Sequence, residues 1–126
     1  MVSFPYRQTS EERTLCWINI KELMNNTDPD FALDLNDPTG GKNSIGNRVE
    51  RAKNHWNKNE FMDPSEICYN DHYNIIGFGD GRHRLVAAYQ LGHQYAPVTM
   101  LKDDVPKIGK IIKLYKNNPS SVIQTT

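Results

Sequence analysis

The sequence predicts a small α/β (α+β) domain built on a mixed sheet, with one strand–turn–helix unit at its centre. Three observations carry this prediction. The chain has 126 residues, enough for one domain with a genuine core. Short apolar runs rich in branched and aromatic residues alternate with segments of helical periodicity. Residues 75–88 pass from an apolar run through alternating glycines into an alanine-rich segment.

The first third of the chain predicts one strand, one short helix and one long loop. Residues 1–13 are polar and carry mixed charge, so we expect a flexible N-terminal arm. Residues 15–20 are apolar and branched and predict a strand, which residues 21–24 continue as a short helix. Residues 25–43 crowd Asn, Asp-Pro and Gly-Gly together and predict a long loop. Loops of this length often serve as lids or partner surfaces, although disorder explains them equally well.

A P-loop is suggested by Gly40, Gly41 and Lys42, but the match fails. The first glycine of that motif is missing, Asn43 stands where Ser or Thr belongs, and no apolar strand precedes it. We therefore expect no P-loop.

A helix is predicted over residues 44–58, with Ser44 as its N-cap. Its apolar stripe consists of Ile45, Val49, Ala52 and Trp56. Arg48 and Arg51 lie one turn apart, so they could reach an anion held nearby, although a solvated face is the common role of such charges. We expect His55 to be a surface or packing histidine, because no second ligand stands at a metal spacing.

The second half predicts a hairpin followed by a strand–helix–strand unit. Residues 66–69 and 73–78 form the hairpin, and a helix over residues 82–91 ends at Gly92. Residues 96–101 predict a strand that completes the unit with a parallel pairing.

An amphipathic helix over residues 103–115 closes the predicted domain, which spans residues 14–116 and contains the loop at 25–43. Residues 117–126 form a polar tail.

Composition limits the function classes. Fifteen Lys and Arg balance fifteen Asp and Glu, so there is no general basic field for nucleic acid and any anion site must be local. Cys16 and Cys68 lie far apart and predict buried free thiols, which suit a reducing compartment. No signal segment or membrane-length apolar run is present, so we expect a cytoplasmic protein without a membrane partner.

The glycine turn is the candidate site. Gly77, Gly79 and Gly81 allow positive φ and close backbone approach, and the side chains of Arg82–Arg84 can all donate to an anion. The start of a helix favours negative charge, so the turn has the local chemistry of a phosphate site. An ordinary strand-to-helix turn, with its basic side chains solvated or paired with Glu50 or Glu66, stays open as the alternative.

The order of elements and this turn together resemble the ParB/sulfiredoxin superfamily. The likeness covers residues 61–101, which hold a hairpin, an Ile-Ile-Gly strand, a Gly-x-His-Arg turn, an alanine-rich helix and a Pro-Val strand. Residues 17–24 look like the strand and short helix that begin this domain, whereas residues 25–45 have no counterpart. The resemblance implies a nucleotide-binding fold.

The branches of the superfamily differ in the turn. Sulfiredoxins have Gly-Cys-His-Arg, and Arg82 stands here at the position of their catalytic cysteine, so we expect no sulfinic acid reductase activity. Chromosome-partitioning ParB proteins have Gly-Glu-Arg-Arg, which binds CTP, and a later helix-turn-helix domain that we do not expect in this chain. Free-serine kinases have Asp-Gly-His-His-Arg, and Asp80, Gly81, His83 and Arg84 match it. Small plasmid or phage ParB-like ATPases and nucleases are similar in size.

The first functional hypothesis is a nucleotide-phosphate site, for ATP or CTP with Mg²⁺, that binds, hydrolyses or transfers a phosphoryl group. The predicted phosphate-binding residues are Gly79, Gly81, Arg82, His83 and Arg84. Asp80 and His83 are the predicted catalytic residues, and the resemblance implies that Asp80 is also the Mg²⁺ ligand.

Two further hypotheses use the same features. In the second, the turn binds DNA phosphates or supports metal-dependent cleavage, and Tyr69, Tyr73 and Phe78 stack bases, although hairpin aromatics are more often core. The third is a non-catalytic inhibitor from a mobile element, which binds a host protein through the loop at 25–43.

Overall fold

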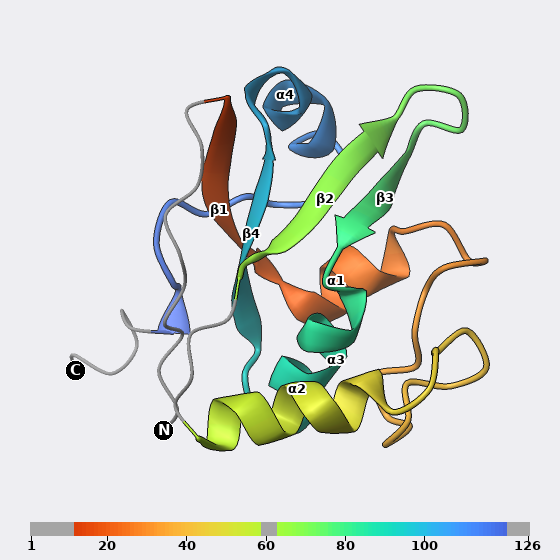
Figure 1. The fold of residues 1–126 in the computed structure, drawn as a ribbon. Coiled ribbons are helices and arrows are strands. Elements are labelled where there is room, and N and C mark those ends of the chain that lie inside the picture. Colours follow the sequence, from red (N-terminus) through yellow and green to blue (C-terminus); the bar gives the residue numbers. More distant parts are fainter. Residues whose placement is uncertain (1–11, 59–62, 121–126) are drawn as a thin grey trace.

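The computed structural model describes residues 12–58 and 63–120 as a mixed sheet with helices packed around it (Figure 1). The strands are β1 (Arg13–Asn19), β2 (Ser65–Asn70), β3 (Ile75–Asp80) and β4 (Tyr95–Leu101). The helices are α1 (Ile20–Asn25), α2 (Arg48–Asn57), α3 (Arg82–Gln90) and α4 (Val105–Ile108), with a 3-10 turn, η1 (Lys102–Asp104), before α4. The predicted fold class is confirmed.

Helices α1, α2 and α3 gather at one end of the sheet, and α4 lies at the opposite end (Figure 1). No helix in the described part of the chain has the length and apolar composition that crossing a bilayer requires. Most of the predicted arm, residues 1–11, and the last six residues of the predicted tail lie outside the described residues.

The strand order in the sheet is β1-β4-β2-β3. The predicted hairpin is present, because β2 and β3 pair antiparallel. The parallel pairing joins β4 to β2, with Ser65 opposite Val98 and Glu66 opposite Thr99, and not to β3 as the predicted strand–helix–strand unit requires. In this order β2 lies between β3 and β4, so α3 carries the chain across β2 before β4 begins. Strand β4 then pairs antiparallel with β1.

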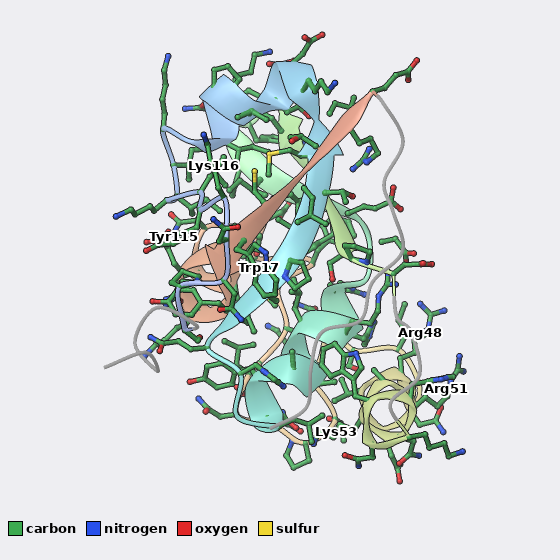
Figure 2. All side chains as sticks on the ribbon, turned by 90° about the vertical axis from the view of Figure 1, so that its left-hand side faces the viewer. Trp17, Arg48, Arg51, Lys53, Tyr115 and Lys116 are labelled. Atoms are coloured by element: carbon green, nitrogen blue, oxygen red, sulfur yellow. The ribbon has the colours of Figure 1, made fainter. Side chains whose placement is uncertain are left out.

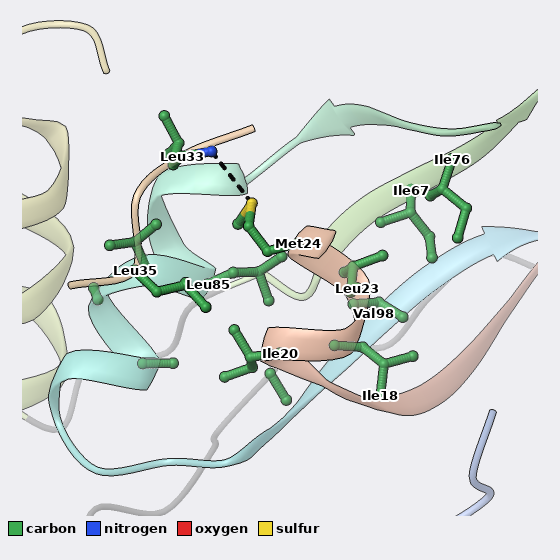
Figure 3. Packing of buried hydrophobic residues seen from close by; sticks show 14 of the residues in the cluster. Ile18, Ile20, Leu23, Met24, Leu33, Leu35, Ile67, Ile76, Leu85 and Val98 are labelled. Atoms are coloured by element: carbon green, nitrogen blue, oxygen red, sulfur yellow. Dashed lines mark hydrogen bonds between the residues drawn. The ribbon is translucent and has the colours of Figure 1, made fainter. Parts of the chain in front are cut away.

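The core lies between the sheet and the helices α1 and α3 (Figure 3). Ile18, Leu23 and Leu85 are fully enclosed. Two residues of the predicted long loop, Leu33 and Leu35, belong to the same core. The loop between α1 and α2 is therefore packed onto the domain along part of its length, because withdrawing it would expose these leucines to water.

Helix α2 begins later than predicted. Its N-cap is Asn47 and not Ser44, and Ile45 is 51% exposed and lies outside the apolar stripe. Gly46 explains the difference, because its φ of +58° lies outside the right-handed helical region and the helix cannot extend back through it to Ser44. The rest of the stripe is buried as predicted.

The amphipathic helix predicted over residues 103–115 is wrong beyond its first turn. Helix α4 ends at Ile108, and Gly109 follows as its C-cap. The chain then turns back to β1, where Tyr115 and Trp17 exchange two backbone hydrogen bonds of 2.8 and 2.9 Å. Ile112 is buried in this turned segment, so its apolar character marks packing and not helical periodicity.

Candidate phosphate site

The turn between β3 and α3 depends on Gly81. Its φ is +88°, and it is the N-cap of α3. A Cβ atom placed there would collide with the Arg84 guanidinium and would lie 2.8 Å from Ser65 Oγ. Ser65 is buried and donates to the Gly81 carbonyl at 2.8 Å, which fixes the turn from the side of β2. Gly77 and Gly79 do not adopt positive φ. Of the three glycines in the predicted turn, only Gly81 therefore has the positive φ for which glycine is required.

A pocket of about 280 Å³ opens between this turn and α2. Its lining consists of Arg48, Arg51, Ala52, His55, Asp80, Gly81, His83 and Arg84. The lining joins the predicted turn to the two arginines of α2, as the sequence suggested. Three arginines face one carboxylate, so the charge of the lining is positive although the whole chain has no net charge.

Helix α2 contributes one face to the pocket. Arg48, Arg51, Ala52 and His55 follow the spacing of residues that share a helix face. Figure 2 shows Arg48 and Arg51 extending to one side of α2 while Lys53 points elsewhere. His55, predicted to be a surface or packing histidine, lines the pocket beside the two arginines, and its helical spacing from them indicates the shared face.

Arg84 is held in place from two directions. One guanidinium nitrogen donates to the Asp63 carbonyl at 2.9 Å, and the other lies 3.0 Å from the Asp80 carboxylate. The Arg84 side chain is 17% exposed and the Asp80 side chain 68% exposed. The guanidinium is thus positioned before any ligand binds, which lowers the entropy that binding must overcome. The sequence offered no signal for the Asp63 carbonyl, because a backbone acceptor leaves no trace in residue type.

The start of α3 has no side-chain cap. Asp80 precedes the N-cap and pairs with Arg84, so it does not satisfy the helix donors. The first turn carries no acidic residue. Its backbone N–H groups and the positive end of the helix dipole therefore reinforce the arginines around the pocket.

His83 lies against the pocket in a neutral state. It is 7% exposed, and its Nε2 accepts a hydrogen bond of 3.2 Å from the Ile45 backbone, which assigns the ring proton to Nδ1. Burial, with Arg82 and Arg48 nearby, lowers the pKa of His83 to about 4. His83 is therefore uncharged at neutral pH.

Arg82 turns to the other side of the helix. Its Nη1 donates to the Phe31 carbonyl at 2.6 Å, and its guanidinium carbon lies 5.9 Å from the centre of the Phe31 ring. Burial and the charge of Arg48 lower the pKa of Arg82, which stays protonated. Neither Arg82 nor Gly79 lines the pocket, so these two predicted phosphate ligands are outside the lining to which Gly81, His83 and Arg84 belong.

The residues of the pocket do not form a Mg²⁺ site by themselves. Asp80 is its one lining carboxylate and already pairs with Arg84. Within residues 12–58 and 63–120, no three His, Cys, Asp or Glu side chains gather as metal ligands. Mg²⁺ prefers several oxygen ligands, which one engaged carboxylate does not supply.

The cysteines take no part in the pocket. Both are free, but Cys68 is exposed and Cys16 only partly buried, so the prediction of two buried thiols is wrong. Cys68 faces Gly77 across the hairpin, where the absent side chain leaves its sulfur open. Burial raises the pKa of Cys16, and burial with the charge of Asp104 raises that of Cys68. Neither thiol is activated as a nucleophile.

Comparisons of the chain with protein-family models, with curated proteins and with solved structures found no match.

Proposed function

We propose that the pocket binds the phosphate groups of a nucleotide, ATP or CTP, in a domain related to the ParB/sulfiredoxin superfamily. The observation that carries the proposal is the convergence of Arg48, Arg51 and Arg84 on the uncapped start of α3 at Gly81. Arginines and a helix N-terminus from separate elements are the donor set that phosphate prefers.

Phosphate binding is favoured by the local positive charge and by the preorganisation of Arg84. Each charge-assisted hydrogen bond contributes roughly 1.5–3 kcal/mol, so one arginine accounts for about a tenfold change in affinity or more. The Asp80 carboxylate opposes the anion, but Arg84 partly neutralises it at 3.0 Å. A bound phosphate would also raise the pKa of His83, which burial, together with the charges of Arg82 and Arg48, lowers to about 4.

Phosphotransfer or hydrolysis would depend on Asp80 more than on His83. The Nε2 atom of His83 is engaged with the Ile45 backbone, and its low pKa makes it a weak base. Asp80 is the exposed carboxylate at the edge of the pocket. The proposed function is therefore nucleotide binding, and turnover is assigned to Asp80 as a second, separately testable step.

The test is calorimetric titration of the full chain with ATP, CTP, ADP and tripolyphosphate, with and without Mg²⁺. We expect Arg84→Ala to weaken binding about tenfold or more. Arg51→Ala is expected to weaken it as well, whereas Lys53→Ala is the matched control, because Lys53 lies on the same helix but not in the pocket. Melting temperatures verify that each variant is folded.

Absence of heat with every phosphate compound would overturn the proposal. Equal losses in Arg51→Ala and Lys53→Ala would also contradict it, because they would indicate a diffuse charge effect. Nucleic-acid phosphates share the same chemistry, so single-stranded DNA is titrated in parallel. Binding of DNA that is tighter than that of ATP would favour the nucleic-acid hypothesis.

A further inference from the structure

Two large apolar side chains are exposed on the loop between α1 and α2. Phe31 is 56% exposed and Ile45 is 51% exposed. The other large apolar residues exposed in the described part of the chain are Tyr73, at the tip of the β2–β3 hairpin, and Leu101, at the end of β4. The exposure of Phe31 and Ile45 on one loop therefore requires an explanation.

Both loop residues are fastened to the start of α3 through their backbones. The Phe31 carbonyl accepts from Arg82, and the Ile45 N–H donates to His83. His83 lines the phosphate pocket, and Arg82 is the residue before it. Arg82, which binds the Phe31 carbonyl, is thus the chain neighbour of a residue in the pocket wall. Consecutive Cα atoms are about 3.8 Å apart.

The loop around Phe31 is braced. The Asn43 side-chain amide donates to the carbonyls of Pro29 and Ala32, at 3.0 and 2.9 Å, so it ties the segments on both sides of Phe31 to the end of the loop. Leu33, two residues further on, is buried in the core. The Phe31 ring is therefore presented to solvent on a fixed backbone.

We infer that the Phe31 ring is the stacking platform for the base of the nucleotide whose phosphates the pocket binds. This inference rests on the proposed function. Arg82 lies over the ring, and its charge adds to that of Arg48. A surface that joins an aromatic ring to arginines fits a ligand that joins an aromatic base to phosphates. An uncharged apolar partner would instead bury the two guanidinium groups without counter-charges.

The platform predicts which ligands the site prefers. Stacking is available to every base, because each base has a π-face. ATP and CTP should therefore bind with similar affinity, and both should bind more tightly than tripolyphosphate, which carries the same phosphates without a base.

The test is titration of the full chain with ATP and with tripolyphosphate. Phe31→Ala should weaken ATP binding about fivefold or more and leave tripolyphosphate binding unchanged. Phe31→Trp should retain ATP binding, because it keeps an aromatic face. Tyr73→Ala is the control, since it removes another exposed aromatic ring, at the hairpin tip, and should change neither affinity.

The outcomes separate this inference from the function on which it rests. If tripolyphosphate binds as tightly as ATP, or if Phe31→Ala lowers both affinities equally, the platform is overturned and the phosphate pocket stands. If the wild-type chain binds neither ligand, both proposals fail. A selective loss of ATP binding in Phe31→Ala, restored in Phe31→Trp, supports the platform.

Discussion

The two sides of the first turn of α3 look alike in sequence and differ in structure. On the loop side, Arg82 donates a hydrogen bond to the Phe31 carbonyl. On the pocket side, Arg84 joins Arg48 and Arg51 around a cavity. Residues two apart on a helix point about 200° apart, so Arg82 and Arg84 leave the first turn in different directions. Two arginines that are close in sequence therefore have different roles. Arg82 supports the loop, and Arg84 can bind an anion in the pocket.

His83 stands between the two sides. It lines the pocket, and its Nε2 atom accepts from the Ile45 backbone on the loop. A change of charge at His83 therefore acts on both sides.

The largest effect is expected from Gly81→Ala, which disturbs both sides together. The variant places a non-glycine residue at a φ of +88°, and its Cβ collides with Arg84 and Ser65. We therefore expect a loss of roughly 2–4 kcal/mol in the free energy of unfolding. Phosphate binding should be lost as well. Urea denaturation measures the first effect and calorimetry the second.

Gly92→Ala is the matched control for that variant. Gly92 also has a positive φ, of +98°, but open space surrounds the position of its Cβ. Its cost should be limited to the conformational strain, about 1–2 kcal/mol. Equal losses in the two variants would show that the contacts around Gly81 contribute nothing.

The next effect is a loss of stability in acid that originates at His83. The unfolded imidazole takes up a proton near its ordinary pKa of 6.5, whereas the pKa of His83 in the folded chain is about 4. Between these values the unfolded state binds more protons, so stability is complete above pH 6.5 and falls as the pH drops toward 4. The loss is on the order of 2–3 kcal/mol.

Urea denaturation across this pH range measures the effect, and His83→Gln is the comparison variant. Glutamine can accept from the Ile45 backbone but does not titrate. The acid-dependent loss should be smaller in this variant than in the wild type. An unchanged pH profile would mean that another group causes the acid sensitivity.

A smaller effect is expected on the loop side from Gln90→Ala. The Gln90 amide donates to the carbonyls of Leu35 and Asp37, at 3.0 and 2.6 Å. Removing it should cost about 1–2 kcal/mol of stability, because two loop carbonyls lose their partner. Tripolyphosphate affinity should not change, whereas Arg51→Ala should lower affinity and leave stability nearly unchanged. A loss of affinity in Gln90→Ala would contradict the division between the two sides.

The smallest effect on stability is expected from Asp80→Asn. An ion pair with one partner this exposed contributes about 0–1 kcal/mol, so the fold should barely respond. Tripolyphosphate affinity should rise a few-fold, because the variant removes a negative charge and frees Arg84. A fall in affinity that appears only with Mg²⁺ would instead assign Asp80 to a metal, as the sequence resemblance implied.

Much of this arrangement was predictable from sequence, because it depends on local chemistry. The glycine before a basic helix start predicted the turn at Gly81, and helical spacing placed Arg48 and Arg51 on one face. The hairpin and the buried stripe of α2 followed from periodicity in the same way.

The features that were missed depend on partners distant in sequence. Strand β4 lies between β1 and β2 and pairs with both, and the segment after Gly109 leaves its helix and pairs Tyr115 with Trp17. The opposite directions of Arg82 and Arg84 depend on where the loop carbonyl of Phe31 lies, which no local pattern specifies.

The central claim is that Arg84, and not Arg82, belongs to the phosphate site, and a crystal structure of the chain soaked with ATP and Mg²⁺ tests it most directly. We predict phosphate oxygens within hydrogen-bond distance of Arg84 and of the backbone N–H groups that follow Gly81, with Arg82 still bound to the Phe31 carbonyl. Phosphates bound by Arg82 with Arg84 uninvolved, or located away from the β3–α3 turn, would contradict the account.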